Sequence, residues 1–430
     1  LQDIKIHINH FGPLDDANLS LAPLIVITGK SNLGKSYANY LIYYFMSSII
    51  DGEFSDFFSS YFDKEKDENE FEFKYSDLEK VLKDRCQNFI RTFLGDKDLI
   101  CDVDFKIPVD DFKFKYRLRP EVDATNTAES LLHKDTHYVC SYFVNGESLY
   151  ENVPLKDRIG IFAFLYFKVI EDIFGRTKMP GSIILPPGRG SFVGENYSMK
   201  NAVASSLGMY QNFFRDYDWC INVPKENRNS TYDEIIKTLI HGDLETNEDK
   251  QYLDVSPDDK IALSAAASSV KELSPLFFFL KNRSTEATSF CFEEPEAHVH
   301  PLAQLDIADI IAKLLNSSDY FNITTHSDYF LQRINQLIKL GDVKKKDEKK
   351  FQDVIEHLKM TPDTFIDREK VKAYYFERDS DDSDGHVKVT NMKLTEDGIP
   401  FRTFFDTVKI LRENEDAIND CLYELKEEGK

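Results

Sequence analysis

One stretch of eight residues constrains the fold of this chain more than any other. Residues 29–36 read Gly-Lys-Ser-Asn-Leu-Gly-Lys-Ser, which matches the pattern G-x-x-x-x-G-K-[ST] in full. The apolar run 24–27 precedes it, and apolar residues recur at helical spacing over residues 38–49. A phosphate-binding loop needs this strand–loop–helix order, because glycines let successive backbone N–H groups face the phosphates and the helix N-terminus adds positive potential. The stretch therefore predicts a nucleotide-binding α/β fold.

The phosphate loop supplies the first candidate site residues. Lys35 is expected to reach the β- and γ-phosphates of ATP, and the Ser36 hydroxyl is expected to ligate Mg²⁺. The candidate nucleotide-binding residues of this stretch are Gly29, Asn32, Gly34, Lys35, Ser36 and Tyr37. ATP and Mg²⁺ are the cofactors that this pattern predicts.

Composition limits the compartment and the partners. The 430 residues carry a formal net charge of −22, so the chain as a whole repels nucleic acid and any contact with it needs a local basic surface. No apolar run approaches the roughly 20 residues of a membrane span. The six cysteines are scattered without a C-x-x-C pair, which is typical of reduced thiols. We expect a cytoplasmic protein that binds no membrane.

Residues 103–119 alternate strictly between apolar and charged positions. We interpret them as a hairpin of two strands, 103–107 and 112–118, joined by a turn at 108–111. One face of the second strand carries four cations, Lys113, Lys115, Arg117 and Arg119. These cations form either a basic platform for nucleic acid or a partner, or a solvated face paired with Asp102 and Asp104 across the hairpin. The second interpretation is favoured.

Two further strand ends predict the rest of a nucleotide site. The apolar run 289–292 ends in Glu293 and Glu294, as a Walker B strand does. Glu293 is the candidate metal-supporting acid, although the position is usually Asp, and Glu294 is the candidate general base. A later strand, 321–325, ends in His326, which we interpret as a sensor of the γ-phosphate. Glu294 and His326 are thus the candidate catalytic residues.

Small residues open a predicted helix between these motifs. Residues 263–273 include Ser268 and Ser269, whose hydroxyl and N–H groups suit a phosphate. Their place before the Walker B strand makes them a candidate signature motif that contacts ATP across a dimer interface.

The order and spacing of these motifs resemble the ABC-type ATPase heads of the RecF/OLD-like group of AAA family ATPases. The residues that carry the resemblance are 8–13, 29–36, 185–189, 267–273, 293–301 and 325–327. The family signature usually has Ser-Ser-Gly where this chain has Ala267-Ser268-Ser269. No Q-loop glutamine stands out, with Gln87 as one option. The resemblance implies two heads that enclose two ATP molecules and join in a homodimer or a higher homo-oligomer.

The predicted fold is an ABC-type P-loop NTPase head with an antiparallel β subdomain, a mostly parallel sheet flanked by helices, and a helical insertion. The domains are expected at 1–50 together with 183–340 (ATPase core), 51–182 (inserted antiparallel strands and helices) and 341–430 (C-terminal hairpin and helical tail). The acidic run 379–384 is expected to form a hairpin turn rather than a calcium site. No heptad run is long enough for an extended coiled coil.

Members of this group include DNA-repair ATPases, OLD nucleases and ATPase subunits of antiphage systems such as Septu and PARIS. The OLD nucleases carry a C-terminal Toprim domain, and no such constellation of metal-binding acids appears after residue 326. The hypothesis is an ATPase that acts as the regulatory subunit of an antiphage system and controls a separate effector protein, a nuclease or a toxin. The alternative is a RecF-like repair ATPase that acts directly on DNA.

Overall fold

The computed structural model describes most of the chain. The described residues are 1–63, 65–120, 138–156, 160–176, 181–193, 208–221, 229–247, 250–256, 259–282, 288–378, 386–400 and 402–428. Among them, no helix combines the length and apolar character needed to cross a membrane. The acidic run 379–384, interpreted above as a turn, lies outside these residues.

A nine-stranded sheet forms the core. Its strands follow the order β5-β1-β2-β16-β15-β3-β14-β13-β9, and the last five of these run parallel. The strands are β1 (Lys5–Phe11), β2 (Leu14–Ser20), β3 (Leu24–Gly29), β5 (Cys101–Lys106), β9 (Ser182–Leu185), β13 (Ser289–Glu293), β14 (Tyr320–Thr324), β15 (Val371–Arg378) and β16 (Val387–Met392). Every residue of β3, β9, β13 and β14 is buried, as expected for parallel strands covered on both faces.

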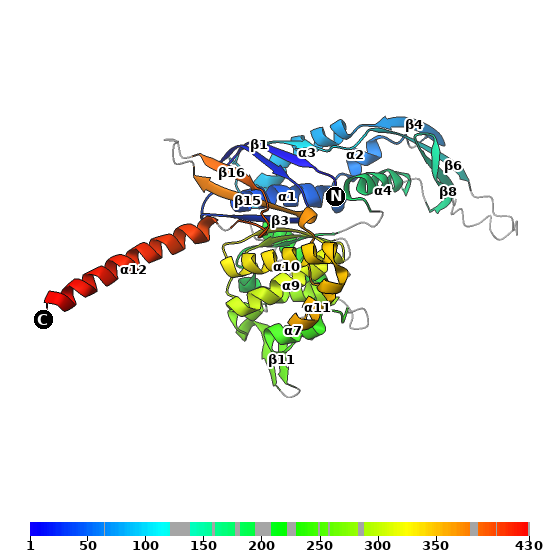
Figure 1. Cartoon of the computed structure of the whole chain (residues 1–430). Helices are drawn as coiled ribbons and strands as arrows, with labels where there is room; N and C mark the ends of the chain where they lie inside the picture. Colours follow the sequence, from blue (N-terminus) through cyan, green and yellow to red (C-terminus); the bar gives the residue numbers. More distant parts are fainter. Residues whose placement is uncertain are drawn as a thin grey trace.

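Helices cover the two faces of the parallel strands. Figure 1 shows α1 above these strands and α9 and α10 below them. The helices of the core are α1 (Lys35–Ile50), α3 (Tyr75–Leu94), α6 (Gly208–Ile221), α7 (Asp233–Ile240), α8 (Ser268–Asn282), α9 (Pro301–Asn316), α10 (Asp328–Lys346) and α11 (Glu348–Leu358). Three 3₁₀ turns of the described residues lie between strands and helices of the chain: η2 (Arg189–Phe192), η4 (Leu263–Ala265) and η5 (Arg368–Lys370). The predicted α/β fold is confirmed.

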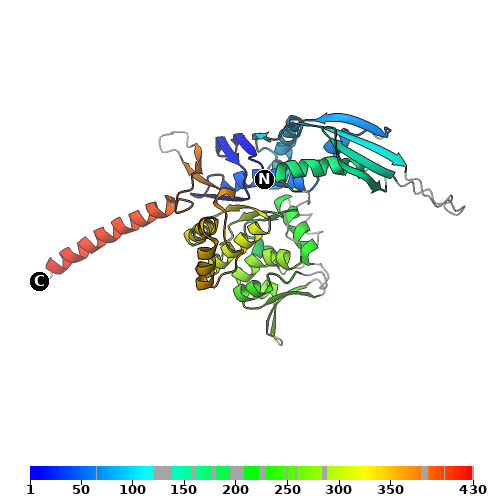
Figure 2. The same cartoon turned by 45° about the vertical axis from the view of Figure 1, so that its right-hand side comes forward.

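A second, antiparallel sheet extends from the core. It contains β4 (Glu68–Phe73), β6 (Phe112–Pro120), β7 (Tyr138–Val144) and β8 (Glu147–Leu155) in that order, with α2 (Ser55–Ser60) and α4 (Ile161–Phe174) beside it. Figure 2 shows this sheet on one side of the core and α12 (Arg402–Glu428) on the other. A third sheet is a meander of β10 (Asp243–Asn247), β11 (Lys250–Ser256) and β12 (Asp259–Ala262).

The hairpin predicted at residues 103–119 does not form. Its first strand, β5, pairs with β1 in the core sheet, while its second, β6, pairs with β4 and β7 in the antiparallel sheet. The cations of β6 therefore face the acids of β4: Lys115 Nζ lies 2.7 Å from Glu68 Oε1, and the Arg117 guanidinium donates to both oxygens of Glu68. Asp104 accepts from Lys83 instead. The alternation of apolar and charged residues correctly predicted the two strands, but it did not predict which strands they pair with.

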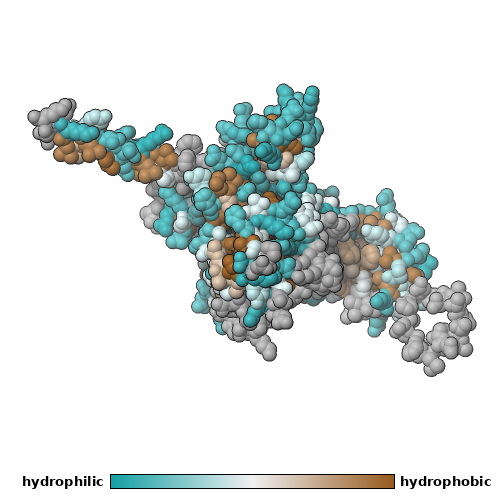
Figure 3. All heavy atoms as spheres, turned by 90° about the horizontal axis from the view of Figure 1, so that it is seen from below, coloured by the Kyte–Doolittle hydropathy of each residue, from teal (hydrophilic) through white to brown (hydrophobic). Residues whose placement is uncertain are grey.

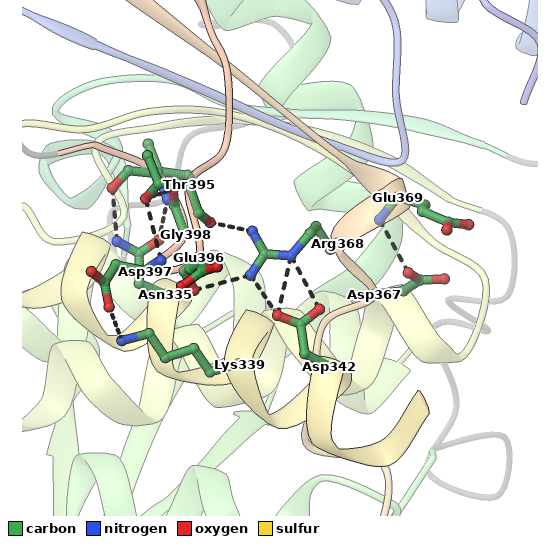
Figure 4. A network of polar contacts seen from close by, with 11 residues as sticks. Asn335, Lys339, Asp342, Asp367, Arg368, Glu369, Thr395, Glu396, Asp397 and Gly398 are labelled. Atoms are coloured by element: carbon green, nitrogen blue, oxygen red, sulfur yellow. Dashed lines mark hydrogen bonds and ion pairs between the residues drawn. The ribbon is translucent and has the colours of Figure 1, made fainter. Parts of the chain in front are cut away.

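The predicted C-terminal hairpin forms, but it belongs to the core sheet. Strand β15 lies beside β3, the strand of the phosphate loop, and β16 joins it to β2. The segments around this hairpin are fastened to α10, as Figure 4 shows. Arg368 forms an ion pair with Asp342 and donates to the carbonyl of Thr395. The buried Asn335 amide exchanges two hydrogen bonds with the backbone of Ile399.

We predict that Asn335→Ala destabilises the fold. The substitution leaves the N–H and C=O groups of Ile399 buried without their partner, which costs about 2–3 kcal/mol. The midpoint of thermal unfolding should fall clearly below that of the parent. Gln332→Ala, an exposed position on the same helix, is the control. Equal midpoints for the two variants would contradict the structural role of Asn335.

Candidate nucleotide site

The phosphate loop is shaped by three residues with positive φ. Gly29, Asn32 and Gly34 have φ of 131°, 60° and 81°. At Gly29 a Cβ atom would lie 2.2 Å from the carbonyl oxygen of Phe376 on β15, so only glycine fits there. Gly34 occupies the N-cap of α1, and no side chain caps that helix. Its first N–H groups therefore remain available to an anion.

Lys35 and Tyr37 line the start of α1. The Lys35 ammonium donates to the carbonyl of Lys30 across the loop at 2.6 Å. Burial lowers the pKa of Lys35, although Glu294 and Glu293 act in the opposite direction. The Tyr37 ring stacks on Phe11 at a centroid distance of 4.6 Å, and it lies so close to Gly12 that a Cβ atom there would be 2.3 Å from the ring. Tyr37 thus joins the loop to the end of β1.

Glu293 is the buried carboxylate of the site. Its Oε2 accepts from the Ser36 hydroxyl at 2.7 Å and from the Thr324 hydroxyl at 3.0 Å, and its Oε1 accepts from the amide of Asn39. Asn322 in turn donates to Asn39 Oδ1 at 2.7 Å. Burial raises the pKa of Glu293, while the hydrogen bonds from Ser36, Asn39 and Thr324 oppose that rise. Three elements, α1, β13 and β14, therefore meet at one carboxylate.

These oxygens fit a magnesium ion. Hard cations prefer hydroxyl and carboxylate oxygens, and Mg²⁺ commonly uses one or two protein ligands together with phosphate oxygens and water. Ser36 and Glu293 would hold the ion, which would neutralise charge on the β- and γ-phosphates. The described residues contain no group of three or more His, Cys, Asp or Glu side chains arranged for a metal. The donor set is accordingly that of a nucleotide-bound metal rather than of a cage made by protein alone.

Glu294, the candidate general base, is exposed, whereas the neighbouring Glu293 is buried. The Glu294 side chain is 46% exposed, and its backbone adopts φ of 45°, a conformation that non-glycine residues rarely adopt. The Glu294 N–H donates to the carbonyl of Thr324 at 3.1 Å, which holds this turn against β14. An exposed carboxylate beside a buried, hydrogen-bonded one is an arrangement that could separate proton transfer from metal binding.

His326, the predicted sensor of the γ-phosphate, lies beside Glu294. Its Nε2 is 4.0 Å from Glu294 Oε1. Burial is the main cause that lowers the pKa of His326, and the positive charge of Lys35 adds to it. A neutral imidazole next to the candidate base is available to donate or accept a hydrogen bond at a phosphate oxygen.

Glu296 was not predicted as a site residue, although it lies in the motif at residues 293–301. Its buried Oε1 accepts from the Thr325 hydroxyl at 2.8 Å and from the N–H groups of His326 and Ser327 at 2.7 and 3.1 Å. Glu296 therefore fixes the loop that presents His326. Asn39 and Thr324 were also missed; Asn39 could have been found, because it lies three residues after Ser36 on the same helix face.

Arg189 connects the candidate signature helix to the Walker B acids. The guanidinium is fully buried and donates to the carbonyls of Glu272, Pro186 and Glu293. Its Nε also lies 3.6 Å from Glu272 Oε2. Burial lowers the pKa of Arg189 to about 10, although the negative charges of four surrounding glutamates act to raise it. The turn at 185–189 carried the resemblance, but the role of its arginine was not predicted.

The structure does not bring Ser268 and Ser269 into contact with the phosphate loop of the same chain. Both open α8, and Ser268 is exposed. Within the described chain, neither hydroxyl has a hydrogen bond to residues 29–36. Gln87, the Q-loop option, lies in α3, where its side-chain oxygen accepts from the N–H of Cys101.

Residues 203–331 match the AAA ATPase domain family. No curated protein sequence matches the chain significantly. Among solved structures, the chain is similar to the Smc head bound to the C-winged helix domain of ScpA (14% identity, 91% of this chain and 98% of that chain, TM-score 0.37). It is also similar to the SMC head domain from Thermotoga maritima (10% identity, 90% and 98%, TM-score 0.32). A third is the Smc head with an extended coiled coil bound to the C-terminal domain of ScpA derived from Pyrococcus furiosus (13% identity, 96% and 98%, TM-score 0.34).

The family match includes the strand of Glu293 and Glu294 and the loop of His326. The phosphate loop lies outside the matched residues and completes the site through the hydrogen bond from Ser36 to Glu293. The protein is therefore an ATPase.

We predict that Glu294→Gln keeps ATP binding and slows hydrolysis by roughly 10²–10⁴-fold, because the amide cannot take a proton from water. Steady-state phosphate release and fluorescent-nucleotide titration measure the two properties. Lys35→Ala is the control that loses binding itself, since the charge facing the phosphates is gone. Parental turnover in Glu294→Gln would show that another group is the base.

Proposed function

We propose that the protein is a cytoplasmic, Mg²⁺-dependent ATPase head that dimerises around ATP and regulates a separate effector protein in a bacterial antiphage defence system. Glu293 and Ser36 hold the metal, Glu294 activates water, and His326 contacts the γ-phosphate. The observation that carries the proposal is the contrast between Ser36 and Glu293, joined within one chain, and the exposed Ser268 of the signature helix, which has no hydrogen bond to its own phosphate loop.

The exposed start of α8 supports the dimer. Its N–H groups and the hydroxyls of Ser268 and Ser269 are potential phosphate donors; Ser268 is exposed and Ser269 is half-buried. In the proposed dimer they reach the nucleotide of the second copy. The buried Arg189 then links that contact to the hydrolytic acids, because it bonds to the backbone of both Glu272 and Glu293.

Charge on the antiparallel sheet supports an effector protein over DNA. The RecF-like alternative needs the cations of β6 as a DNA-binding platform. However, Lys115 and Arg117 already pair with Glu68, and Lys113 lies opposite Glu72 in the register of β4 and β6. A surface whose cations are paired with neighbouring carboxylates gains little from releasing counterions on DNA.

The dimer makes a prediction for mixed subunits. A Lys35→Ala chain retains an intact α8, and a chain with Ser268→Ala and Ser269→Ala retains an intact phosphate loop. Each variant alone should lose nearly all ATPase activity, and their mixture should recover at most one working site per dimer. Titrating one variant into the other at constant total protein measures this recovery. Full activity in the serine variant alone would show that each site is completed within one chain.

The effector makes a separate prediction. Purified alone, the protein should hydrolyse ATP slowly and should cleave neither DNA nor RNA. Co-expressed with the product of the neighbouring gene, it should co-purify as a complex whose effector activity is changed by Glu294→Gln. Tight but salt-sensitive duplex binding by the isolated chain, lost on replacement of Lys113, Lys115, Arg117 and Arg119, would favour the DNA-repair function instead.

A further inference from the structure

Helix α12 carries an apolar surface that the chain itself does not cover. Figures 1 and 2 show the helix leaving the core, and Figure 3 shows apolar side chains gathered along one of its sides. Of the side chains described in it, residues 407–426, only Val408 is partly buried and the others are exposed. Leu411 and Ile418 are each 61% exposed, and Leu425 is 59% exposed. A lone helix with such a surface requires a partner in water.

The spacing of the apolar residues identifies the kind of partner. Val408, Leu411, Ile418, Leu422 and Leu425 fall on alternating steps of three and four residues, with Glu415 at the remaining position of the pattern. This is the a/d seam of a two-stranded coiled coil, in which side chains of one helix insert between those of another. Ile410 and Tyr423 are also exposed but lie off this seam. The surface therefore suits a single helix of similar length.

We propose that α12 pairs with the α12 of a second copy of this chain in an antiparallel coiled coil. The charges along the helix select both the partner and the direction. Residues 402–412 contain three cations and one carboxylate, whereas residues 413–428 contain seven carboxylates and one lysine. An antiparallel pair places each basic half against an acidic half. A parallel pair would set the two acidic halves side by side.

The antiparallel arrangement also defines which residues meet. When a positions face d positions, Leu411 lies opposite Leu422 of the second copy, and Val408 lies opposite Leu425 of the second copy. Glu415 then lies opposite Ile418 of the second copy, where a charge loses water without gaining a partner. Glu415 should weaken the pair and keep it reversible.

The segment that precedes α12 is fixed to the ATPase core. Residues 395–399, which precede the helix, are bound to α10 through Arg368 and Asn335, as Figure 4 shows. Pairing of two α12 helices would therefore join two cores in one assembly, whether or not nucleotide is bound.

Sedimentation of the full chain tests the pairing. The experiment uses the Lys35→Ala protein without nucleotide, so that closure of two heads around ATP cannot cause association. We expect a concentration-dependent dimer, with Leu411→Asp and Leu422→Asp together weakening it more than about tenfold, since burial of each leucine contributes about 1.4 kcal/mol or more. Ile410→Asp with Tyr423→Asp, off the seam, is the matched control and should leave the dimer unchanged. All four positions are exposed in the single chain, so neither pair should alter its thermal unfolding.

Glu415→Leu should strengthen the dimer, while Glu413→Leu on the opposite side of the helix should not. A monomer at every concentration, or equal effects of the seam and control variants, would overturn the proposal.

Disulfide trapping tests the direction. Cys421 is the exposed cysteine of the described chain, and the other five are buried, so Cys421→Ser provides the background. A Leu411→Cys chain mixed with a Leu422→Cys chain should form a cross-linked heterodimer under mild oxidation, because the two Cβ atoms face each other. The Leu411→Cys chain alone should not cross-link to itself. Efficient cross-linking between two Leu411→Cys chains would overturn the antiparallel direction.

Discussion

The carboxylate of Glu293 is the interaction on which the nucleotide site depends. A buried charge is costly unless hydrogen bonds replace the water that it loses. Here the donors come from Ser36 and Asn39 on α1 and from Thr324 on β14, so satisfying the charge fixes the helix against the sheet. This contact also positions two neighbouring segments. The phosphate loop precedes α1, and the turn of Glu294 follows β13. Glu293 therefore joins the phosphate loop to the Walker B strand.

The parts of the site that the sequence predicted are those encoded locally. The phosphate loop, the acids after β13 and the histidine after β14 each stand at the end of a buried strand, and parallel strands bring such ends to one edge. What could not be predicted depends on long-range pairing. Alternation in residues 103–119 indicates two strands but does not reveal that β5 and β6 enter different sheets. The C-terminal hairpin likewise gave no sign that β15 would lie beside β3.

The same limit explains the missed residues. Apart from the carbonyl of Pro186, the contacts of Arg189 come from Glu272 and Glu293, more than 80 positions away. Glu296 stands next to predicted site residues, but its role depends on the backbone of a loop 30 residues later. Buried polar groups of this kind are recognisable only once the fold brings their partners together.

The position of β15 has a consequence for how the protein is made. The central strand β3 is synthesised long before residues 371–376, which pair with one of its two edges and pack against Gly29. Until those residues emerge, β3 presents an unpaired edge, the kind of surface that chaperones protect and that aggregation exploits. The pairing of β3 with a strand so distant in the sequence also slows folding, since a long loop must close first. Nascent chains should therefore acquire a complete phosphate loop only after β15 has been synthesised.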